Sequence, residues 1–521
     1  MKFTNSFFQL LGLACAGSLL FFALNYASGI NLWDEGHLWY GVQRTALGEF
    51  PVLDFMSYDP GRYYWSALFI KIFRNSSIVI CRAAASVFEV FAILVGLRLI
   101  WNSSNSTIKL RNFLFLNVAT LILALWMYVW YKIFDSACSI FVIGTLKFLL
   151  ESPSKNRFFI SGIFLGLIAV FGRNHGIYGI FGLMLILAFM FYQATNKKEL
   201  LKNTFYFLPG LIVGFSPLFV MIGLIPGFGK AFWESIISVF KFKSTNFPLN
   251  IPWPWAVDFS SRPFRYAIPD LLVGIFFVFI LIFAFVSLIW LIFRKVKNKN
   301  IDCVILACAA VAIPYAHYAF SRADLFHLSL GVFPFLIGTL AFSYHYLGRL
   351  KWPVCLVLFI TTARLMFFAH PGYTCWRSSK CEMVTIAGSH LKVTLEQKNS
   401  LLWLTDLKNR FAPNEENVLI LPYWPGVYSV IEKRSPIWEI YALWPRDKEF
   451  ELQEIEKIKS ARPAVVVFLD FAVDGKEELH FKNTHPLTYQ YIKNNFDVVP
   501  EYSDPSIQVM KPKSEQKVIL N

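Results

Sequence analysis

Residues 31–65 read NLWDEGHLWYGVQRTALGEFPVLDFMSYDPGRYYW, and they follow an apolar run that ends near residue 27. The stretch places two adjacent carboxylates, Asp34 and Glu35, beside a hydrophobic segment long enough to cross a bilayer. It then adds Asp59 and the polar and aromatic cluster at residues 60–64. Charged side chains at the edge of a membrane are costly, so acids in this position favour a functional role.

The composition indicates a membrane protein. The 521-residue chain is 56% hydrophobic and only 16% charged, whereas about a quarter of the residues of soluble domains are charged. Its apolar runs predict a polytopic α-helical protein with about 11 transmembrane helices. The predicted spans are 6–27, 77–100, 112–131, 136–150, 158–171, 176–193, 204–225, 269–293, 302–320, 327–347 and 352–369. The first is longer than the roughly 7–15 apolar residues of a signal peptide, so we expect a retained helix.

Membrane topology accounts for the net charge of +15. The basic residues do not form one patch but gather in short loops between alternate spans, for example at 109–111, 294–299 and 349–351. Such loops stay in the cytoplasm. The pattern predicts a cytoplasmic N-terminus and an extracytoplasmic C-terminus, and it does not call for a nucleic-acid partner.

Two domains are predicted. Residues 1–370 form a transmembrane region with outer loops at 28–76 and 226–267, and residues 371–521 form an extracytoplasmic α/β domain. Short β-branched runs at 417–424 and 464–470 predict buried strands, and helical patterns occur near 388–410 and 447–460. The second domain has no Gly-rich phosphate loop and no GxSxG motif, so its sequence does not specify a role.

The segment 226–267 contains FPLNIPWPWAVDF at 247–259. Its prolines exclude a long helix there, and its tryptophans favour the headgroup zone. We expect an interfacial segment with a short amphipathic helix near 230–243. It serves either as an anchor alone or as a lid over a groove for a lipid substrate.

Cys375 and Cys381 flank the polar loop CWRSSKC. A local disulfide is expected if this loop faces an oxidising compartment, and two free thiols are the alternative.

Four groups of residues in the predicted outer loops hold most of the polar side chains that a site could use. They are Asp34, Glu35 and His37; Asp59, Arg62 and Tyr63, which close the same loop; Arg173 and His175; and Arg322, Asp324 and His327. All four groups fall on one predicted membrane face, so a helical bundle can bring them to one pocket. A carboxylate there can take a proton from an attacking hydroxyl, and arginine side chains suit a phosphate.

Each of these residues also has a structural explanation. Asp34 and Glu35 can stabilise a helix N-terminus, Arg322 and Asp324 can form a salt bridge, and His327 can cap a helix. Arg173 and His175 can be ordinary polar loop residues. No ligand spacing of a known metal site occurs, so we predict no cofactor, although the acids could bind a divalent metal.

The segments WDEG at 33–36, LGEFPVLDF at 47–55 and YDPGRYYW at 58–65 resemble the first outer loop of the GT-C glycosyltransferase superfamily. The resemblance is to its protein mannosyltransferase-like and aminoarabinose transferase-like branch, through about residue 370. This sequence has PGRYYW where many members have a double proline. The resemblance implies a polyprenyl-phosphate sugar donor, inversion at the anomeric carbon, and a first-loop aspartate as base. That role falls on Asp34, with Glu35 as its neighbour or back-up.

The resemblance implies a hexosyl- or pentosyltransferase of the bacterial inner membrane that glycosylates a hydroxyl of an envelope lipid, glycan or protein. From their positions, we infer that Arg62, Arg173 and Arg322 contact phosphate or sugar. One alternative is a transporter or flippase for a lipid-linked glycan, which the ionisable residues Glu89, Lys132 and Asp135 keep open. The other alternative is a non-catalytic scaffold. The sequence specifies neither the sugar nor the acceptor.

Overall fold

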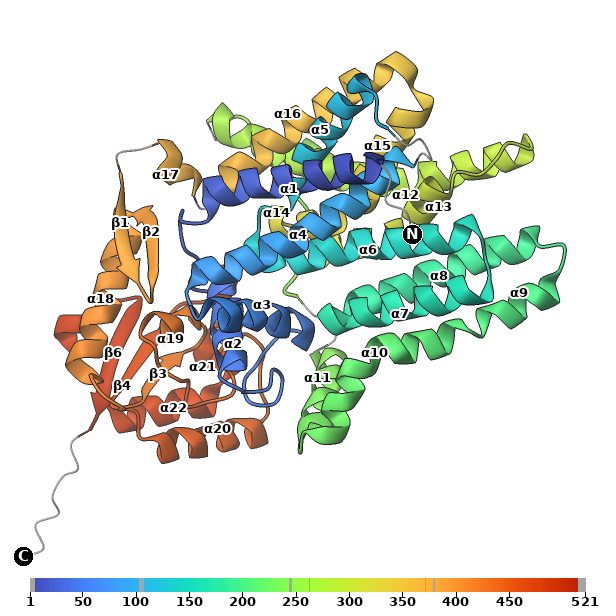
Figure 1. Ribbon diagram of the computed structural model, residues 1–521. Coiled ribbons are helices and arrows are strands. Elements are labelled where there is room, and N and C mark those ends of the chain that lie inside the picture. Colours follow the sequence, from blue (N-terminus) through green and yellow to red (C-terminus); the bar gives the residue numbers. More distant parts are fainter. Residues whose placement is uncertain are drawn as a thin grey trace, which may run out of the picture. The chain divides into compact units, whose positions relative to one another are not determined.

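The computed structural model describes residues 5–102, 107–242, 246–261, 263–370, 372–377 and 380–513 (Figure 1). Contacts divide the chain into two compact units. The first unit comprises residues 1–26 and 82–373, and the second comprises residues 27–81 and 374–521. We expected residues 28–76 to be a loop of the membrane region, but they pack within the same unit as the C-terminal residues.

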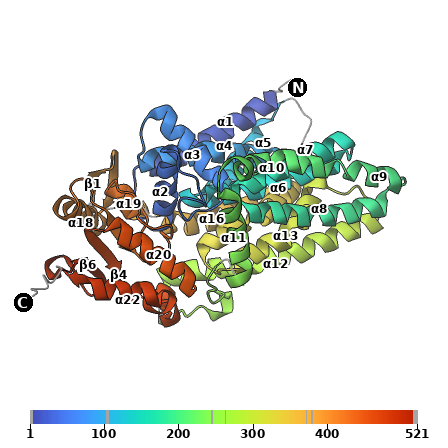
Figure 2. The same cartoon turned by 90° about the horizontal axis from the view of Figure 1, so that it is seen from below.

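Helices build the first unit, and most of them are apolar. They are α1 (Asn5–Asn25), α4 (Ile78–Trp101), α5 (Leu110–Trp126), α6 (Ile133–Glu151), α7 (Lys155–Phe171), α8 (Arg173–Gln193), α9 (Lys197–Thr204), α10 (Phe207–Leu224), α11 (Phe228–Phe242), α12 (Phe264–Val296), α13 (Cys303–Phe320), α14 (Leu325–Gly331), α15 (Phe333–Tyr346) and α16 (Lys351–Ala369). The core lies around α6, which contacts α7, α8, α13, α14 and α15. Figure 2 shows α6, α8, α12 and α13 running side by side.

Among the described residues, eight helices are long and apolar enough to cross a membrane. There are up to nine if α14 and α15, which are bent by 56° at their junction, form one span. The predicted count of about 11 is therefore not confirmed. Helices α5 and α7 have 17 residues each, so they are about 26 Å long, shorter than the roughly 30 Å hydrocarbon core.

Glycines let α7 and α10 pack backbone against backbone. A Cβ atom at Gly162 would lie 2.2 Å from the Phe207 carbonyl oxygen, and one at Gly166 would lie 2.5 Å from that of Leu211. On the facing helix, a Cβ atom at Gly214 would lie 2.1 Å from the carbonyl oxygen of Ile163. Small residues four positions apart are how membrane helices approach closely, because side-chain hydrophobicity cannot drive association in lipid.

The second unit is an α/β structure. A four-stranded sheet has the order β3 (Val418–Leu421), β4 (Val465–Leu469), β6 (Ile507–Pro512) and β5 (Phe496–Val498). Strands β3 and β4 are parallel and the other pairs are antiparallel. These parallel strands are the two runs that the sequence predicted. The helices are α2 (Asp34–Ala46), α3 (Pro60–Phe73), α17 (Tyr373–Arg377), α18 (Leu395–Phe411), α19 (Gly426–Val430), α20 (Lys448–Ala461), α21 (Phe481–Thr484) and α22 (Pro486–Asn495).

The prediction of a helix near 388–410 is wrong for residues 388–394. The structure has a hairpin of β1 (Cys381–Ile386) and β2 (Ser389–Thr394), and α18 begins only at Leu395. Ala387 and Gly388 both have positive φ, which is the geometry of a tight hairpin turn. Thr394 and Gln397 then form a capping box that starts α18.

Hydrogen bonds and close packing join residues 27–81 to the C-terminal part of the second unit. Lys392 on β2 donates its N–H to Ala27 and accepts the N–H of Gly29. Gly36 lies so close to Gly426 that a Cβ atom at Gly36 would come within 2.5 Å of the Gly426 Cα atom. The loop therefore folds as part of the α/β unit.

Cys375 and Cys381 form a disulfide in the second unit. Residues 378–379 of the intervening loop lie outside the described part of the chain. Of the two alternatives that the sequence left open, the structure has the bonded one.

The α7–α10 contact predicts unequal effects for two identical substitutions on α10. Gly214→Val would force a side chain into the Ile163 backbone and should lower the free energy of unfolding by about 1–3 kcal/mol. Gly223→Val should change it little, because a Cβ atom there meets nothing within 4 Å. Thermal unfolding of both purified variants in detergent compares them, and equal stabilities would contradict the packing.

Candidate active site

Asp34 is the first residue of α2 and is partly exposed. The hydroxyl of Tyr441 donates a hydrogen bond of 2.6 Å to its Oδ1 atom. The helix N-terminus also favours a negative charge at this position. Asp34 is thus an accessible carboxylate that is oriented by a side chain from the C-terminal part of the same unit.

Glu35 has a different environment. Its side chain is buried, with a relative exposure of 6%, and its Oε2 atom accepts the backbone N–H of Asn31 at 3.2 Å. The Asn31 side chain in turn accepts the N–H of Trp33 at 2.9 Å. Glu35 therefore closes the turn before α2, a structural role that the sequence analysis did not foresee. Its role as a back-up base stays a prediction.

Aromatic side chains cluster around Trp33, which precedes Asp34 in the chain, and around Tyr441, its hydrogen-bond partner. Trp33 contacts Tyr423, Trp424 and Phe471, with ring centroids 5.2, 6.1 and 5.6 Å away. The ring of Tyr441 lies 5.4 Å from that of Tyr423. We call Trp33, Tyr423, Trp424, Tyr441 and Phe471 the aromatic cluster.

Sequence reasoning missed the aromatic cluster, although a signal was present. Tyr423 and Trp424 follow strand β3, and Phe471 follows β4. Because these strands are parallel, their carboxyl ends meet at one edge of the sheet, where ligands of α/β folds commonly bind. Tyr441 has no such signal, since it lies in an irregular segment.

His37 lies against the rings of Tyr58 and Tyr441, with centroid distances of 4.9 and 5.2 Å. Its Nε2 atom is 3.0 Å from the carbonyl oxygen of Met56. His37 therefore connects the start of α2 with the segment that leads into α3.

Asp59, Arg62 and Tyr63 stand at the start of α3, and all three are buried. The Arg62 guanidinium lies 4.9 Å above the ring of Tyr58. Tyr63 is fully buried, and its hydroxyl accepts the N–H of Tyr58 at 3.0 Å. Burial raises the pKa of Tyr63 well above its usual value. These contacts give Tyr63 a packing role, and the predicted substrate contacts of Asp59, Arg62 and Tyr63 stay predictions.

In the first unit, His175 forms a buried network with two residues that the sequence analysis did not assign to the site. Its Nε2 atom lies 3.2 Å from Oδ1 of Asp135, and its Nδ1 atom lies 2.9 Å from the Tyr315 hydroxyl. His175 and Tyr315 are fully buried, and Asp135 nearly so. The network connects α6, α8 and α13.

Arg173 interacts with the amphipathic helix α11, which the sequence predicted near 230–243. Its Nη1 atom donates to the Ser235 hydroxyl at 2.8 Å, and its guanidinium lies 4.8 Å above the ring of Phe232. Trp233 and Phe240 on the same helix are exposed. Helix α11 is therefore held at the start of α8 and still exposes an apolar face.

Arg322, Asp324 and His327 form a local cluster at the start of α14. Arg322 donates its Nε–H to Asp324 at 3.0 Å, and Nδ1 of His327 lies 2.9 Å from the other Asp324 oxygen, which also accepts the His327 backbone N–H at 2.8 Å. Burial by itself raises the pKa of Asp324, but the hydrogen bonds and charge of His327 and the charge of Arg322 outweigh it and hold this pKa below its usual range. The structure thus has the Arg322–Asp324 salt bridge that was one structural alternative, and Asp324 rather than His327 caps the helix.

The predicted site residues are divided between the two units. Asp34, Glu35, His37, Asp59, Arg62 and Tyr63 belong to the second, and Arg173, His175, Arg322, Asp324 and His327 belong to the first. Within each unit the structure brings several of them together. Their meeting in one pocket stays a prediction. No group of three His, Cys, Asp or Glu side chains suited to a metal occurs in the described part of the chain.

The fold resembles that of known proteins. No protein-family model and no curated protein sequence matches the chain. ArnT from Cupriavidus metallidurans, in a crystal structure with undecaprenyl phosphate, is 11% identical with a TM-score of 0.52, over 96% of this chain and 97% of ArnT. Its apo structure gives a TM-score of 0.51. AglB, an oligosaccharyltransferase from Archaeoglobus fulgidus in complex with an inhibitory peptide and a dolichol-phosphate, is 11% identical with a TM-score of 0.50, over 98% of this chain and 75% of AglB.

The chain therefore has the fold of ArnT, an aminoarabinose transferase, and of AglB, and the former is named in the resemblance drawn from the sequence. The chain is a polytopic helical membrane protein with an α/β unit, as predicted.

The buried network predicts a stability effect at His175. His175→Leu would remove the hydrogen-bond partner that Asp135 and Tyr315 share, at a cost of roughly 2 kcal/mol in the free energy of unfolding. His317→Leu is the matched control, because His317 is an exposed residue of α13. Thermal unfolding in detergent measures both, and a His175→Leu protein as stable as the control would contradict the network.

Proposed function

Starting from the fold that this chain shares with ArnT and AglB, we propose that it is a membrane glycosyltransferase. It takes a sugar from a polyprenyl phosphate and passes it to a hydroxyl of an envelope lipid, glycan or protein, with inversion. The protein lies in a bacterial inner membrane, with a cytoplasmic N-terminus and an extracytoplasmic C-terminal domain. The observation that carries the proposal is the oriented, partly exposed carboxylate of Asp34.

Asp34 acts as general base in this proposal. The acceptor oxygen forms a bond to the anomeric carbon, and its proton passes to the Asp34 carboxylate. The bond between that carbon and the phosphate oxygen breaks, and its electron pair leaves with the lipid phosphate. A base must lie within about 2.6–3.2 Å of the proton-bearing oxygen, so its orientation matters as much as its charge. The hydrogen bond from Tyr441 supplies that orientation.

The aromatic cluster is the proposed contact surface for the acceptor. Trp33, Tyr441 and Phe471 are partly exposed, whereas Tyr423 and Trp424 are mostly buried behind them. Such side chains offer apolar surface together with polar edges, and they suit an amphipathic acceptor. The arginines of the predicted site, Arg62, Arg173 and Arg322, are the proposed contacts for phosphate or sugar, since guanidinium groups suit phosphate geometry.

A transporter of a lipid-linked glycan is the second candidate, because ionisable side chains occur inside the helical unit. Glu89 on α4 is buried and accepts a hydrogen bond of 2.8 Å from the Ser18 hydroxyl. Intramembrane acids often mark a translocation path. Sugar transfer requires the Asp34 carboxylate as a base, whereas transport does not, so a substitution of Asp34 distinguishes the two candidates.

Asp34→Asn should abolish sugar transfer, with a loss of about 100-fold or more, because an amide cannot accept the proton. Asp54→Asn is the matched control, since Asp54 is an exposed acid of the same segment whose carboxylate accepts the Phe50 N–H. Mass spectrometry of envelope glycolipids and glycans from a deletion strain, complemented with each variant at matched protein levels, makes the comparison. If the Asp34→Asn variant restores the sugar, Asp34 is not the general base, and the protein is more consistent with a transporter or a non-catalytic scaffold.

Tyr441→Phe should lower kcat about tenfold and leave KM for the lipid-linked sugar nearly unchanged, because only the orientation of Asp34 is lost. Steady-state kinetics with purified protein and a polyprenyl-phosphate sugar separate the two constants. A rise in KM with constant kcat would instead assign Tyr441 to substrate binding.

A further inference from the structure

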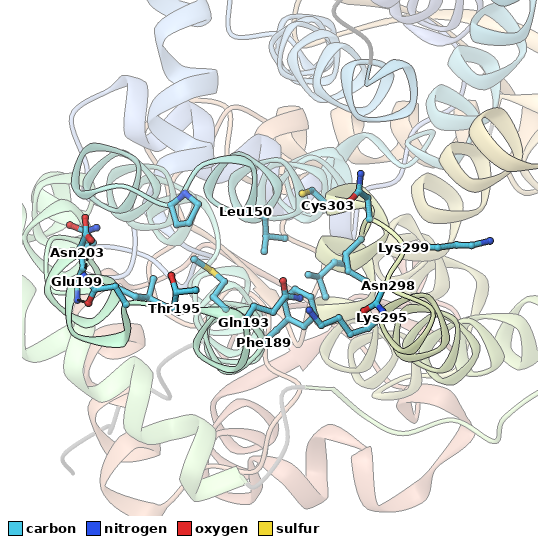
Figure 3. A pocket seen from close by; sticks show the side chains of 18 residues that line it. Leu150, Phe189, Gln193, Thr195, Glu199, Asn203, Lys295, Asn298, Lys299 and Cys303 are labelled. Carbon is cyan, nitrogen blue, oxygen red and sulfur yellow. Dashed lines mark hydrogen bonds between the residues drawn. The ribbon is translucent and has the colours of Figure 1, made fainter.

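A cavity of about 720 Å³ lies in the first unit, and the proposed transfer reaction makes no use of it. The ends of α6, α8 and α12, the start of α13, and helix α9 line it. In Figure 3, Leu150 and Cys303 lie on one side of the opening, and Phe189, Gln193 and Lys295 lie on the opposite side. Glu199 and Asn203 stand at one end, and Lys299 extends away from the other labelled side chains.

The cavity and the candidate site residues of this unit lie at opposite ends of the same helices. Helix α8 begins at Arg173 and ends at Gln193, which lines the cavity. Helix α13 begins at Cys303, also in the lining, and ends at Phe320, close to Arg322. The 21 residues of α8 span about 30 Å, which is the thickness of the hydrocarbon core. The cavity therefore sits where this unit meets the opposite membrane surface.

The lining is amphipathic. Leu150, Phe189, Leu200 and Leu306 supply apolar surface. Polar groups occupy the rest, mainly the amide side chains Gln193, Asn196, Asn203, Asn298 and Asn300 and the ammonium groups of Lys295 and Lys299. Amides and ammonium groups donate hydrogen bonds, and the apolar part suits hydrocarbon. A ligand with an anionic head and an acyl portion matches both.

Positive charge dominates around the cavity. Residues 193–204 and 294–303 carry seven lysines and arginines against two acids. Both acids already have hydrogen-bond partners at helix N-termini. Glu199 exchanges hydrogen bonds with Asn196 at the start of α9, and Asp302 caps α13 and accepts the Tyr346 hydroxyl. Within the described residues, no carboxylate pairs with Lys295 or Lys299.

We propose that this cavity binds the phosphate headgroup of an anionic phospholipid from the adjacent leaflet. Lys295, which is partly buried, and Lys299, which is exposed at the edge of the lining, supply the charge. The amide side chains donate to the phosphate oxygens, and the apolar lining receives the first acyl carbons. Basic pockets between membrane helices bind anionic headgroups in this way. The proposal does not depend on the transfer activity, since it concerns the opposite ends of these helices.

The test measures lipid binding to the purified full-length protein by native mass spectrometry. Phosphatidylglycerol should bind more tightly than phosphatidylcholine. The double variant Lys295→Gln, Lys299→Gln should weaken phosphatidylglycerol binding by about thirtyfold, because each lysine near an anionic bilayer surface contributes roughly fivefold in affinity. Lys295→Arg, Lys299→Arg should retain the binding, since it keeps both charges.

The matched control is Lys109→Gln, Arg111→Gln, which removes the same charge from exposed residues outside the cavity lining. If the control and the cavity variant lose equal affinity for phosphatidylglycerol, the cavity is not the binding site, and the lipid is attracted by the overall positive charge of this surface. Equal binding of the two lipids to the wild-type protein would also overturn it. Displacement of the lipid by micromolar glycerol phosphate would overturn the lipid as the ligand and assign the cavity to a soluble phosphate compound.

Discussion

The absence of water in the hydrocarbon core is the constraint on which the helical unit depends, because each polar group inside it must find a partner within the protein. Several such partners come from neighbouring helices. Asp135, His175 and Tyr315 satisfy one another, Ser18 donates to Glu89, and the indole N–H of Trp126 donates to the Thr362 hydroxyl. Such hydrogen bonds select which helices become neighbours. Apolar side chains do this only weakly in a membrane, because the surrounding lipid is equally apolar.

The same constraint explains where the remaining charge lies. Arginine, lysine and aspartate side chains concentrate at the helix ends, and the two ends differ chemically. Arg173 and Arg322 stand at one end with aromatic partners and an ion pair. Lysines and amides surround a cavity at the other. A single set of helices thus offers two polar surfaces separated by about the thickness of a bilayer.

The second unit follows the logic of a water-soluble domain. A buried sheet supplies its core, and the close approach of Gly36 to Gly426 lets the start of α2 pack against it. As a result, the segment that carries Asp34 takes its orientation from residues about 400 positions later in the chain, above all from Tyr441. The C-terminal residues therefore belong to the environment of Asp34, a role that their own sequence does not reveal.

Much of the architecture could be predicted from local patterns. Apolar runs placed most helices of the first unit within about five residues, although α9 was not predicted and α14 and α15 were predicted as one span. The β-branched runs placed β3 and β4, and the alternation of basic loops predicted one topology. The number of spans was less certain, because α5 and α7 are borderline in length. The strand at 389–394 was mistaken for helix, since its turn depends on positive φ at Ala387, which composition does not reveal.

The sequence by itself determined a helical membrane protein with a terminal α/β domain, and it singled out the acids after the first span. These features depend on hydrophobicity and period, which are local properties of the chain. Only the tertiary structure decided that residues 27–81 fold with the C-terminal unit, that Tyr441 orients Asp34 while Glu35 closes a turn, and that Asp135 pairs with His175. These features depend on contacts between residues far apart in sequence, and no local pattern encodes such contacts.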